Sequence, residues 1–283
     1  MKKTYLIEIK DETFEEERSL YNLKNAVVSN CRFSGAVDGE SPLKESKDIK
    51  VEKSFFDLRY SFWHVNFGFV SECNFSSLAR APFWYCNNLV IDKVTSEAVK
   101  VFRECKNVEI IDSSFKSEEP FWKNNHITVK SSSVEGFYGF FNCKHALINN
   151  LSFKGKYSFQ YNKNLIILNS NLDTKDAFWH CKNVVVVNSI IKGEYIGWYS
   201  SNMTFINCTI ESHQPFCYAK RLKFIDCKMP NCDLAFEMST VKGNIIGEIE
   251  SIKNPKRCKM HVDRVKEIIQ DNTLGKACIK LKK

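Results

Sequence analysis

A repeat of constant length constrains the fold of this chain more than any other feature of its sequence. From Asn88, steps of nineteen residues reach Asn107, His126, His145, Asn164, Asn183, Asn202, Arg221 and Thr240, with no insertion or deletion. We call these nine residues the markers. A large apolar residue, usually Phe, stands five positions before most markers, as Phe83, Phe102 and Phe178 do. A fixed period near 20 residues predicts a solenoid, in which each coil buries its apolar face against its neighbours.

The pattern inside each repeat decides which kind of solenoid to expect. Apolar residues alternate with polar ones over short stretches separated by Asn, Asp, Gly or Ser, which is the periodicity of strands. Helical repeats mostly have longer periods, and the repeats of six or five residues that mark other β-solenoids are absent from the sequence. Because parallel crossovers are right-handed, the sequence predicts an all-β, single-stranded, right-handed parallel β-helix of about a dozen coils.

The limits of the repeat suggest the domain organisation. Residues 1–24 read as an N-terminal strand and an acidic cap, which would cover the exposed edge of the first coil. Residues 25–270 carry the coils and form one domain with the cap. Residues 271–283 read as a loose basic tail.

Composition limits the classes of function. The net charge is +8, but Lys and Arg are spread along the coils, so we expect no nucleic-acid partner. No apolar run resembles a signal peptide or a membrane span, which predicts a cytoplasmic protein without a membrane partner. The twelve cysteines include no C-x-x-C pair, and most recur in two columns of the repeat. We therefore expect reduced, buried space-filling residues, with no metal and no cofactor.

One column of charged residues has a structural explanation. Nine positions after successive markers the sequence reads Glu97, Lys116, Glu135, Lys154, Asp173, Lys192 and Glu211. Residues nineteen apart should stack at about 4.8 Å in a parallel β-helix, and the alternating sign then pairs opposite charges. We interpret this column as an ion-pair ladder.

A second column holds every tryptophan of the chain. Four positions before the markers stand Trp84, Trp122, Phe141, Trp179, Trp198 and Phe236, and Trp63 stands four before Phe67, the equivalent position one coil before Asn88. Strand alternation turns this column outward if the Phe column faces the core, and the polar residues Arg103 and Gln160 interrupt it. An exposed row of aromatic rings suits stacking against sugars. The alternatives are a partly buried column and a surface for self-association.

A mixed polar stripe runs beside the tryptophans, seven and eight positions before the markers. It includes Asp176 and Glu194, one rung apart, and two neighbouring carboxyl groups can act as general acid and base, or as acid and nucleophile, on a glycosidic bond. His180 lies close in sequence, although strict alternation turns it inward. The candidate catalytic residues are Asp176, Glu194 and His180. The candidate binding residues are Trp84, Arg80, Lys100, Arg103, Trp122, Tyr157, Trp179, Tyr195, Trp198 and Glu237.

Several short motifs resemble one known family. These are GESPLKES at 39–46, KDAFWH at 175–180, GEYIGWYS at 193–200, NCTIES at 207–212 and LAFE at 234–237. They resemble a largely bacterial domain of unknown function that is assigned to the pectin-lyase-like right-handed β-helices. The resemblance spans nearly the whole chain and implies the fold. It implies no reaction, so no catalytic residue is transferred from it.

Two hypotheses of function follow. The first is a carbohydrate-binding protein, with hydrolase or lyase activity left open, whose groove is lined by the tryptophans. A cytoplasmic location favours an oligosaccharide or a sugar conjugate as its ligand. The second is a non-catalytic scaffold that binds another protein or a further copy of itself through the aromatic face.

Overall fold

The computed structural model describes residues 4–36, 39–271 and 276–281. The predicted parallel β-helix with about 19 residues per coil is confirmed, and the described residues form about 14 turns without any helix. No segment in these ranges is therefore a helix long and apolar enough to cross a membrane. The chain forms two compact units, unit 1 (Met1–Phe140) and unit 2 (Phe141–Lys283), which we describe one at a time. That the coils make one domain with the N-terminal cap stays a prediction.

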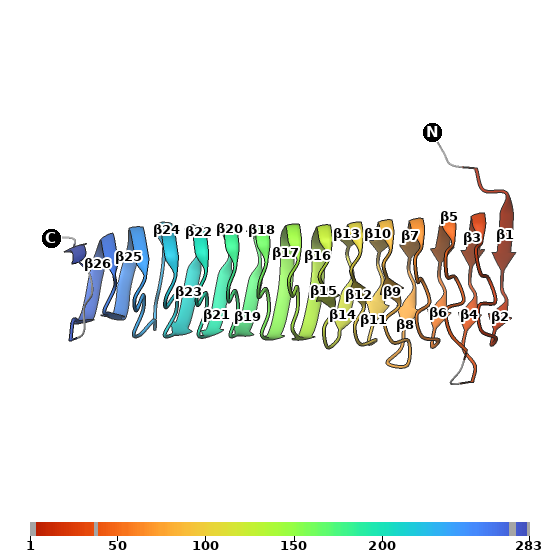
Figure 1. Ribbon diagram of the computed structural model, residues 1–283, viewed down its shortest axis with the longest axis horizontal. Helices are drawn as coiled ribbons and strands as arrows, with labels where there is room; N and C mark the ends of the chain where they lie inside the picture. Colours follow the sequence, from red (N-terminus) through yellow and green to blue (C-terminus); the bar gives the residue numbers. More distant parts are fainter. Residues whose placement is uncertain (1–3, 37–38, 272–275, 282–283) are drawn as a thin grey trace. The chain divides into compact units, whose positions relative to one another are not determined.

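Unit 1 contains three rows of parallel strands (Figure 1). The first row consists of β1 (Ile7–Lys10), β3 (Lys24–Ser29), β5 (Lys47–Glu52), β7 (Asn66–Ser71), β10 (Asn87–Asp92), β13 (Lys106–Ile111) and the start of β16 (Asn125–Phe137). The second consists of β2 (Thr13–Phe14), β4 (Arg32–Phe33), β6 (Phe55–Phe56), β8 (Asn74–Phe75), β11 (Thr95–Ser96), β14 (Ser114–Lys116) and the end of β16. The third consists of β9 (Phe83–Trp84), β12 (Phe102–Arg103) and β15 (Phe121–Trp122).

Unit 2 is built from the same kind of coil, with longer strands (Figure 1). Its first row consists of β17 (Lys144–Lys156), β18 (Lys163–Leu168), β20 (Lys182–Val187), β22 (Ser201–Ile206), β24 (Lys220–Cys227), β25 (Thr240–Lys253), β26 (Arg257–Ile269) and β27 (Lys276–Leu281). The end of β17 begins its second row, with β19 (Asn171–Lys175), β21 (Ile190–Glu194) and β23 (Thr209–His213). Strand β27 pairs with β26 inside the segment predicted as a loose tail, so the sheet extends further than the repeat suggested.

The core is a stack of phenylalanine rings, as the Phe column predicted. In unit 1, Phe83 stacks on Phe102 with ring centroids 4.8 Å apart, and Phe102 stacks on Phe121 at 5.2 Å. In unit 2, Phe159 and Phe178 stack at 4.9 Å. All five side chains are fully buried. Because each ring covers the next at about the strand spacing, the stack holds the coils in register.

Each coil turns at residues with left-handed backbone conformation, and the markers are one set of these. Asn164, Asn183 and Asn202 have φ values of 59°, 59° and 56°. Asn tolerates this region better than most residues because its short side chain can bond locally. The Asn183 amide donates to Asn164 and the Asn202 amide to Asn183, both over 2.8 Å. His145 takes the same conformation in the same column, with φ 54°.

Gly197 occupies a corner that admits no side chain. Its φ is +74°, and a Cβ atom built on it would lie 2.5 Å from the Phe216 ring. This close approach explains why Gly197 stands in the column five before the markers, where most coils hold Phe.

The cysteines are free, and all except Cys278 are buried, which agrees with the expected space-filling role. Burial raises the pKa of the Cys73 and Cys181 thiols to about 12. A neutral thiol is a poor nucleophile, so these cysteines serve packing. Polar residues in the same column form hydrogen bonds to the backbone. The Ser200 hydroxyl, for example, accepts a hydrogen bond from the Cys181 N–H over 2.9 Å.

The charged column stacks as predicted within each unit. In unit 2 the paired positions run Lys154, Asp173, Lys192 and Glu211 on consecutive rungs. The Lys192 ammonium lies 3.0 Å from the Glu211 carboxylate. Both groups are substantially exposed, so we expect the ladder to favour the correct register more than it stabilises the fold.

Reversing one rung tests the ladder. Lys192→Glu would place three acidic side chains on consecutive rungs, and we expect the free energy of unfolding to fall by about 1 kcal/mol or less. The loss should be larger at low salt, because salt screens exposed charges. Thermal unfolding at two salt concentrations measures it. The double variant Lys192→Glu/Glu211→Lys should recover part of the loss, and a loss independent of salt would contradict the electrostatic explanation.

Candidate functional site

The tryptophan column is half-buried, where the sequence predicted an outward row of exposed rings. In unit 2 the Trp179 and Trp198 rings stack with centroids 5.5 Å apart and planes 8° from parallel. Each ring therefore covers a face of the other, and sugar stacking needs an uncovered face. The expectation of a solvent-facing aromatic stripe is corrected on this point.

In unit 2, the indole N–H groups explain why Trp179 and Trp198 turn partly inward. Trp179 donates to the Tyr195 carbonyl over 2.6 Å, and Trp198 donates to the Gln214 carbonyl over 2.8 Å. In the preceding coil, Gln160 donates its amide N–H to the Asp176 carbonyl over 2.8 Å. All three bonds satisfy a carbonyl at the next left-handed corner. Gln160 thus replaces the hydrogen bond of a tryptophan, and its polarity does not mark an exposed surface.

In unit 1 the other interruption of the column also has an internal partner. The Arg103 guanidinium lies 5.5 Å from the centre of the Trp84 ring and 5.3 Å from that of Trp122. Its Nη1 atom is 3.4 Å from the Glu119 carboxylate, and the Lys100 ammonium is 3.7 Å from the same carboxylate. Four of the predicted binding residues therefore form a cation–π and ion-pair cluster. The fifth in this unit, Arg80, is exposed.

An exposed aromatic ladder that the sequence analysis missed lies three positions before the markers in unit 2. Tyr161, His180, Tyr199 and Tyr218 are all exposed. Successive ring centroids are 5.0, 5.2 and 5.1 Å apart, with planes within 12° of parallel. His180 therefore faces solvent between two tyrosines, although alternation predicted an inward side chain.

The reason for this difference is local. His180 has a φ of 55°, and a left-handed residue breaks the alternation that an extended strand would keep. The recurrence of Tyr or His three positions before consecutive markers was the signal that could have revealed the ladder.

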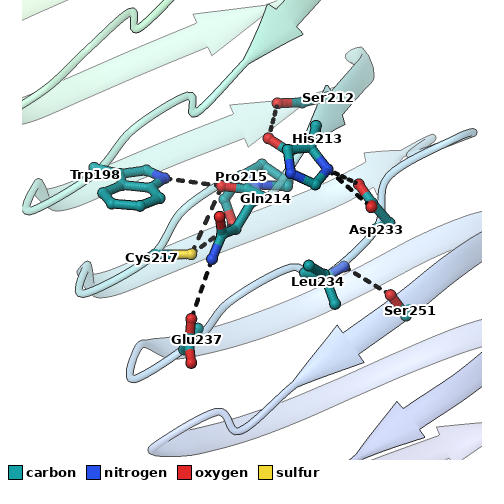
Figure 2. A network of polar contacts seen from close by, with 10 residues as sticks. All are labelled: Trp198, Ser212, His213, Gln214, Pro215, Cys217, Asp233, Leu234, Glu237 and Ser251. Carbon is teal, nitrogen blue, oxygen red and sulfur yellow. Dashed lines mark hydrogen bonds and ion pairs between the residues drawn. The ribbon is translucent and has the colours of Figure 1, made fainter.

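The polar stripe of unit 2 brings three of the predicted site residues, Asp176, Glu194 and Tyr195, together at one corner of the coil. We define it as Lys175, Asp176, Glu194, Tyr195, His213, Gln214 and Asp233. Glu194 pairs in register with His213, and His213 with Asp233. The Lys175 ammonium lies 2.6 Å from the Glu194 carboxylate, and His213 Nδ1 lies 2.8 Å from both oxygens of Asp233 (Figure 2). Consecutive rungs thus carry cation, carboxylate, imidazole and carboxylate.

The two carboxyl groups predicted to be catalytic differ in their surroundings. Asp176 is only 9% exposed, and burial raises the pKa of its carboxyl group. The hydrogen bond from Lys175 lowers the pKa of the exposed Glu194 carboxyl group. Their backbones are joined, since the Asp176 N–H donates to the Glu194 carbonyl over 2.8 Å. The two pKa values are therefore shifted in opposite directions, and acid–base catalysis uses pairs of groups whose surroundings do this.

Glu237 connects the stripe to the tryptophan column. Figure 2 shows the Gln214 amide donating to Glu237 over 3.2 Å, while the Gln214 carbonyl accepts from Trp198. The Lys253 ammonium lies 3.2 Å from the other oxygen of Glu237. Glu237 is half-buried, and its carboxylate is shared between Gln214 and Lys253.

Two tyrosines predicted to bind ligand lie at the corner position of Asp176 in neighbouring coils. Tyr157 is 37% exposed, and its N–H donates to the Lys175 carbonyl over 2.8 Å. The Tyr195 ring packs edge-on against His213, with centroids 5.5 Å apart. Within the described ranges, no three His, Cys, Asp or Glu side chains are grouped to hold a metal ion.

Comparison with known families assigns the chain. The model of one family matches residues 7–280, which is nearly all of the solenoid. The chain belongs to this family. Its description is "Protein of unknown function (DUF3737)", and the resemblance seen in the short motifs is thereby confirmed. Comparison with curated proteins finds no match to the DUF3737 chain.

Solved structures with similar folds include several β-helix proteins. The A-module of the Azotobacter vinelandii mannuronan C-5 epimerase AlgE4 is 8% identical, with 99% of this chain and 90% of that chain covered and a TM-score of 0.33. The periplasmic alginate epimerase AlgG is 12% identical over 94% and 77%, with a TM-score of 0.30. The Streptococcus pneumoniae surface adhesin PfbA is 11% identical over 97% and 84%, with a TM-score of 0.33. At these values the comparisons indicate no ligand or reaction for the DUF3737 chain.

The corner hydrogen bond of Gln160 can be tested by an isosteric change. Gln160→Met keeps the size of the side chain and leaves the Asp176 carbonyl without its donor, so unfolding should become easier by about 1–3 kcal/mol. Gln160→Trp restores an N–H donor of the kind found in the next two coils and should lose less. Chemical denaturation measures both variants. An equal loss in the two would contradict the proposed role of the donor.

The surroundings of Asp176 predict a dependence on pH. A carboxyl group whose pKa is raised by folding costs the folded state stability as pH rises through the interval above about 3.9. Asp176→Asn should therefore raise the melting temperature relative to the parent at about pH 7 and leave it nearly unchanged at about pH 3. Glu194→Gln should show the reverse, with stability lost only at the higher pH, because its pKa is lowered. If both variants shift equally at both pH values, the two carboxyl groups do not differ as described.

Proposed function

We propose that unit 2 binds an oligosaccharide or a sugar conjugate along its polar stripe and acts on it by acid–base chemistry. The observation that carries this proposal is the pair Asp176 and Glu194, adjacent in the fold, whose pKa values are displaced in opposite directions by burial and by Lys175. Such pairs are found where one group gives a proton and another receives one.

The spacing of the stripe supports a chain-like ligand. Rungs of a parallel sheet repeat at about 4.8 Å, which is similar to the length of one pyranose residue. Donors and acceptors alternate along Lys175, Glu194, His213 and Asp233, and hydroxyl groups of successive sugars can bond to both kinds. The aromatic rings contribute their edges and polar atoms, since neighbouring rings cover their faces.

The proposed chemistry follows from the protonation states. Asp176, whose pKa is raised by burial, would donate a proton to the oxygen of the leaving sugar. Glu194, on the neighbouring rung, would act as the general base or the nucleophile. For an acidic sugar, His213 offers the base that β-elimination requires, with Asp233 orienting its ring through Nδ1. A sugar of modest size is favoured over a large polymer by the predicted cytoplasmic location.

A second candidate function is a scaffold that binds protein. Leu147, Ile166 and Ile190 in unit 2 are 39%, 43% and 43% exposed, and large apolar residues on a sheet surface are suited to a protein partner. The scaffold needs neither Asp176 nor Glu194, which gives the two functions different requirements.

Glycan binding and turnover separate the two functions. The parent protein should bind members of a glycan array, with a change of tryptophan fluorescence in solution. Asp176→Asn and Glu194→Gln preserve shape and remove one charge each, so we expect turnover to fall by about 100-fold or more while binding changes little. Glu211→Gln, in the ion-pair ladder, is the matched control and should be neutral for both.

The outcomes are distinct. Turnover that survives both substitutions would remove the acid–base role and leave a binding protein. A parent that binds no glycan would reject the carbohydrate proposal and favour the scaffold.

A further inference from the structure

A basic groove lies on a different side of the coil in unit 2, on the outer face of β24, β25 and β26. Its volume is about 630 Å³. Its charged lining residues are Arg221, Lys223, Lys242, Arg257 and Lys259, and the described lining includes no Asp or Glu. All five cationic side chains are exposed. The sequence showed Lys and Arg spread along the coils, but folding brings these five to one surface.

None of the five cations makes an ion pair with another residue in the described ranges. Further along the same two strands, β25 and β26 do form ion pairs. Arg264 lies 3.0 Å from Glu248, and Lys266 lies 2.6 Å from Glu250. The missing counter-charge is therefore a property of the groove and not of these strands as a whole.

The lysines of the groove are stacked in a way that costs stability. Lys223 pairs in register with Lys242, and Lys242 with Lys259. Like charges on consecutive rungs, about 4.8 Å apart, repel one another. The ladder at Lys192 and Glu211 shows that the same coil can alternate its charges. Lys144, Lys163 and Lys182 stack in the same way outside the groove, so a lysine row alone does not mark a site. Inside the groove the row shares a hollow with Arg221 and Arg257, and these cations together suit a ligand that brings negative charges at a similar repeat.

We propose that this groove binds an acidic oligosaccharide, with carboxylate or sulfate groups along the lysine row. Arg221 and Arg257 flank the row and can bind such groups with two parallel hydrogen bonds. Asn202 and Thr204 add neutral polar side chains for sugar hydroxyls.

A nucleic acid fits the lining less well. Binding of single strands generally uses aromatic side chains as stacking platforms, and the groove's described lining contains none. The site is separate from the polar stripe, which lies where β21 and β23 end, so the groove would bind its ligand whether or not the stripe acts on a sugar.

The test compares two double variants of equal charge. Lys223→Gln/Lys242→Gln removes two adjacent cations of the groove. Lys163→Gln/Lys182→Gln removes two exposed lysines that are also in register, at the starts of β18 and β20, but lie outside the groove. The probes are a short oligogalacturonate, a neutral maltooligosaccharide of equal length and single-stranded oligo-dT, and affinity is measured by calorimetry at two salt concentrations.

The parent should bind oligogalacturonate and not the neutral sugar, with weaker binding at high salt. The groove variant should bind about tenfold or more weakly, and the control variant should match the parent. The groove variant should also melt at a higher temperature than the parent at low salt, because a repulsion is removed. This second measurement shows that the variant is folded.

Three results would overturn the proposal. These are no binding of oligogalacturonate by the parent, equal losses in the groove and control variants, and tighter binding of oligo-dT through the same lysines. Asp176→Asn should leave this affinity unchanged, so failure of the groove proposal and failure of the polar-stripe proposal are distinguishable.

Discussion

The left-handed corner is the constraint on which the rest of the structure depends. In one coil of unit 2, Asn183, Asn188, Tyr195 and Tyr199 all have φ between 50° and 59°. Residues other than glycine seldom adopt this conformation, and here hydrogen bonds between the side-chain amides of stacked asparagines help to hold it. Because the corners recur at the same positions in most coils, each side chain there lies above its equivalent. The phenylalanine stack, the asparagine ladders and the ion-pair ladder all follow from that repetition.

In most columns the stacked side chains are each other's partners. Amides hydrogen-bond to amides, rings cover rings, and alternating charges form ion pairs, as Lys192 and Glu211 do. Columns of this kind need no ligand. The exceptions are therefore informative. Asp176 places a carboxyl group where burial opposes its ionisation, and Lys223 and Lys242 place like charges on adjacent rungs. Both arrangements cost stability in the free protein, which is common at functional sites.

Much of the fold could be predicted because the same pattern of residues recurs in successive coils. The Phe column identified the core, and the spacing of nineteen identified the strand pairing, as Leu165 opposite Val184 shows. The candidate site was harder to predict from the sequence, because strand alternation does not continue through the left-handed corners. His180 turns outward, and the half-buried Trp179 and Trp198 donate to backbone carbonyls, because the intervening residues are left-handed.

The sequence by itself determined the coil length, the parallel register and the columns that stack, since these depend only on which residues are nineteen apart. It also brought Asp176 and Glu194 to neighbouring rungs. Only the tertiary structure decided which side chains in a column reach solvent, since this depends on backbone torsion at each corner. It also decided that Arg257 and Lys259 join Arg221 and Lys223 in one groove, because β26 pairs with β25 at a spacing of 17 residues and not 19, with Arg257 opposite Thr240. The local sequence pattern determines which residues stack on one another, and the backbone path in three dimensions determines which of them are exposed to a ligand.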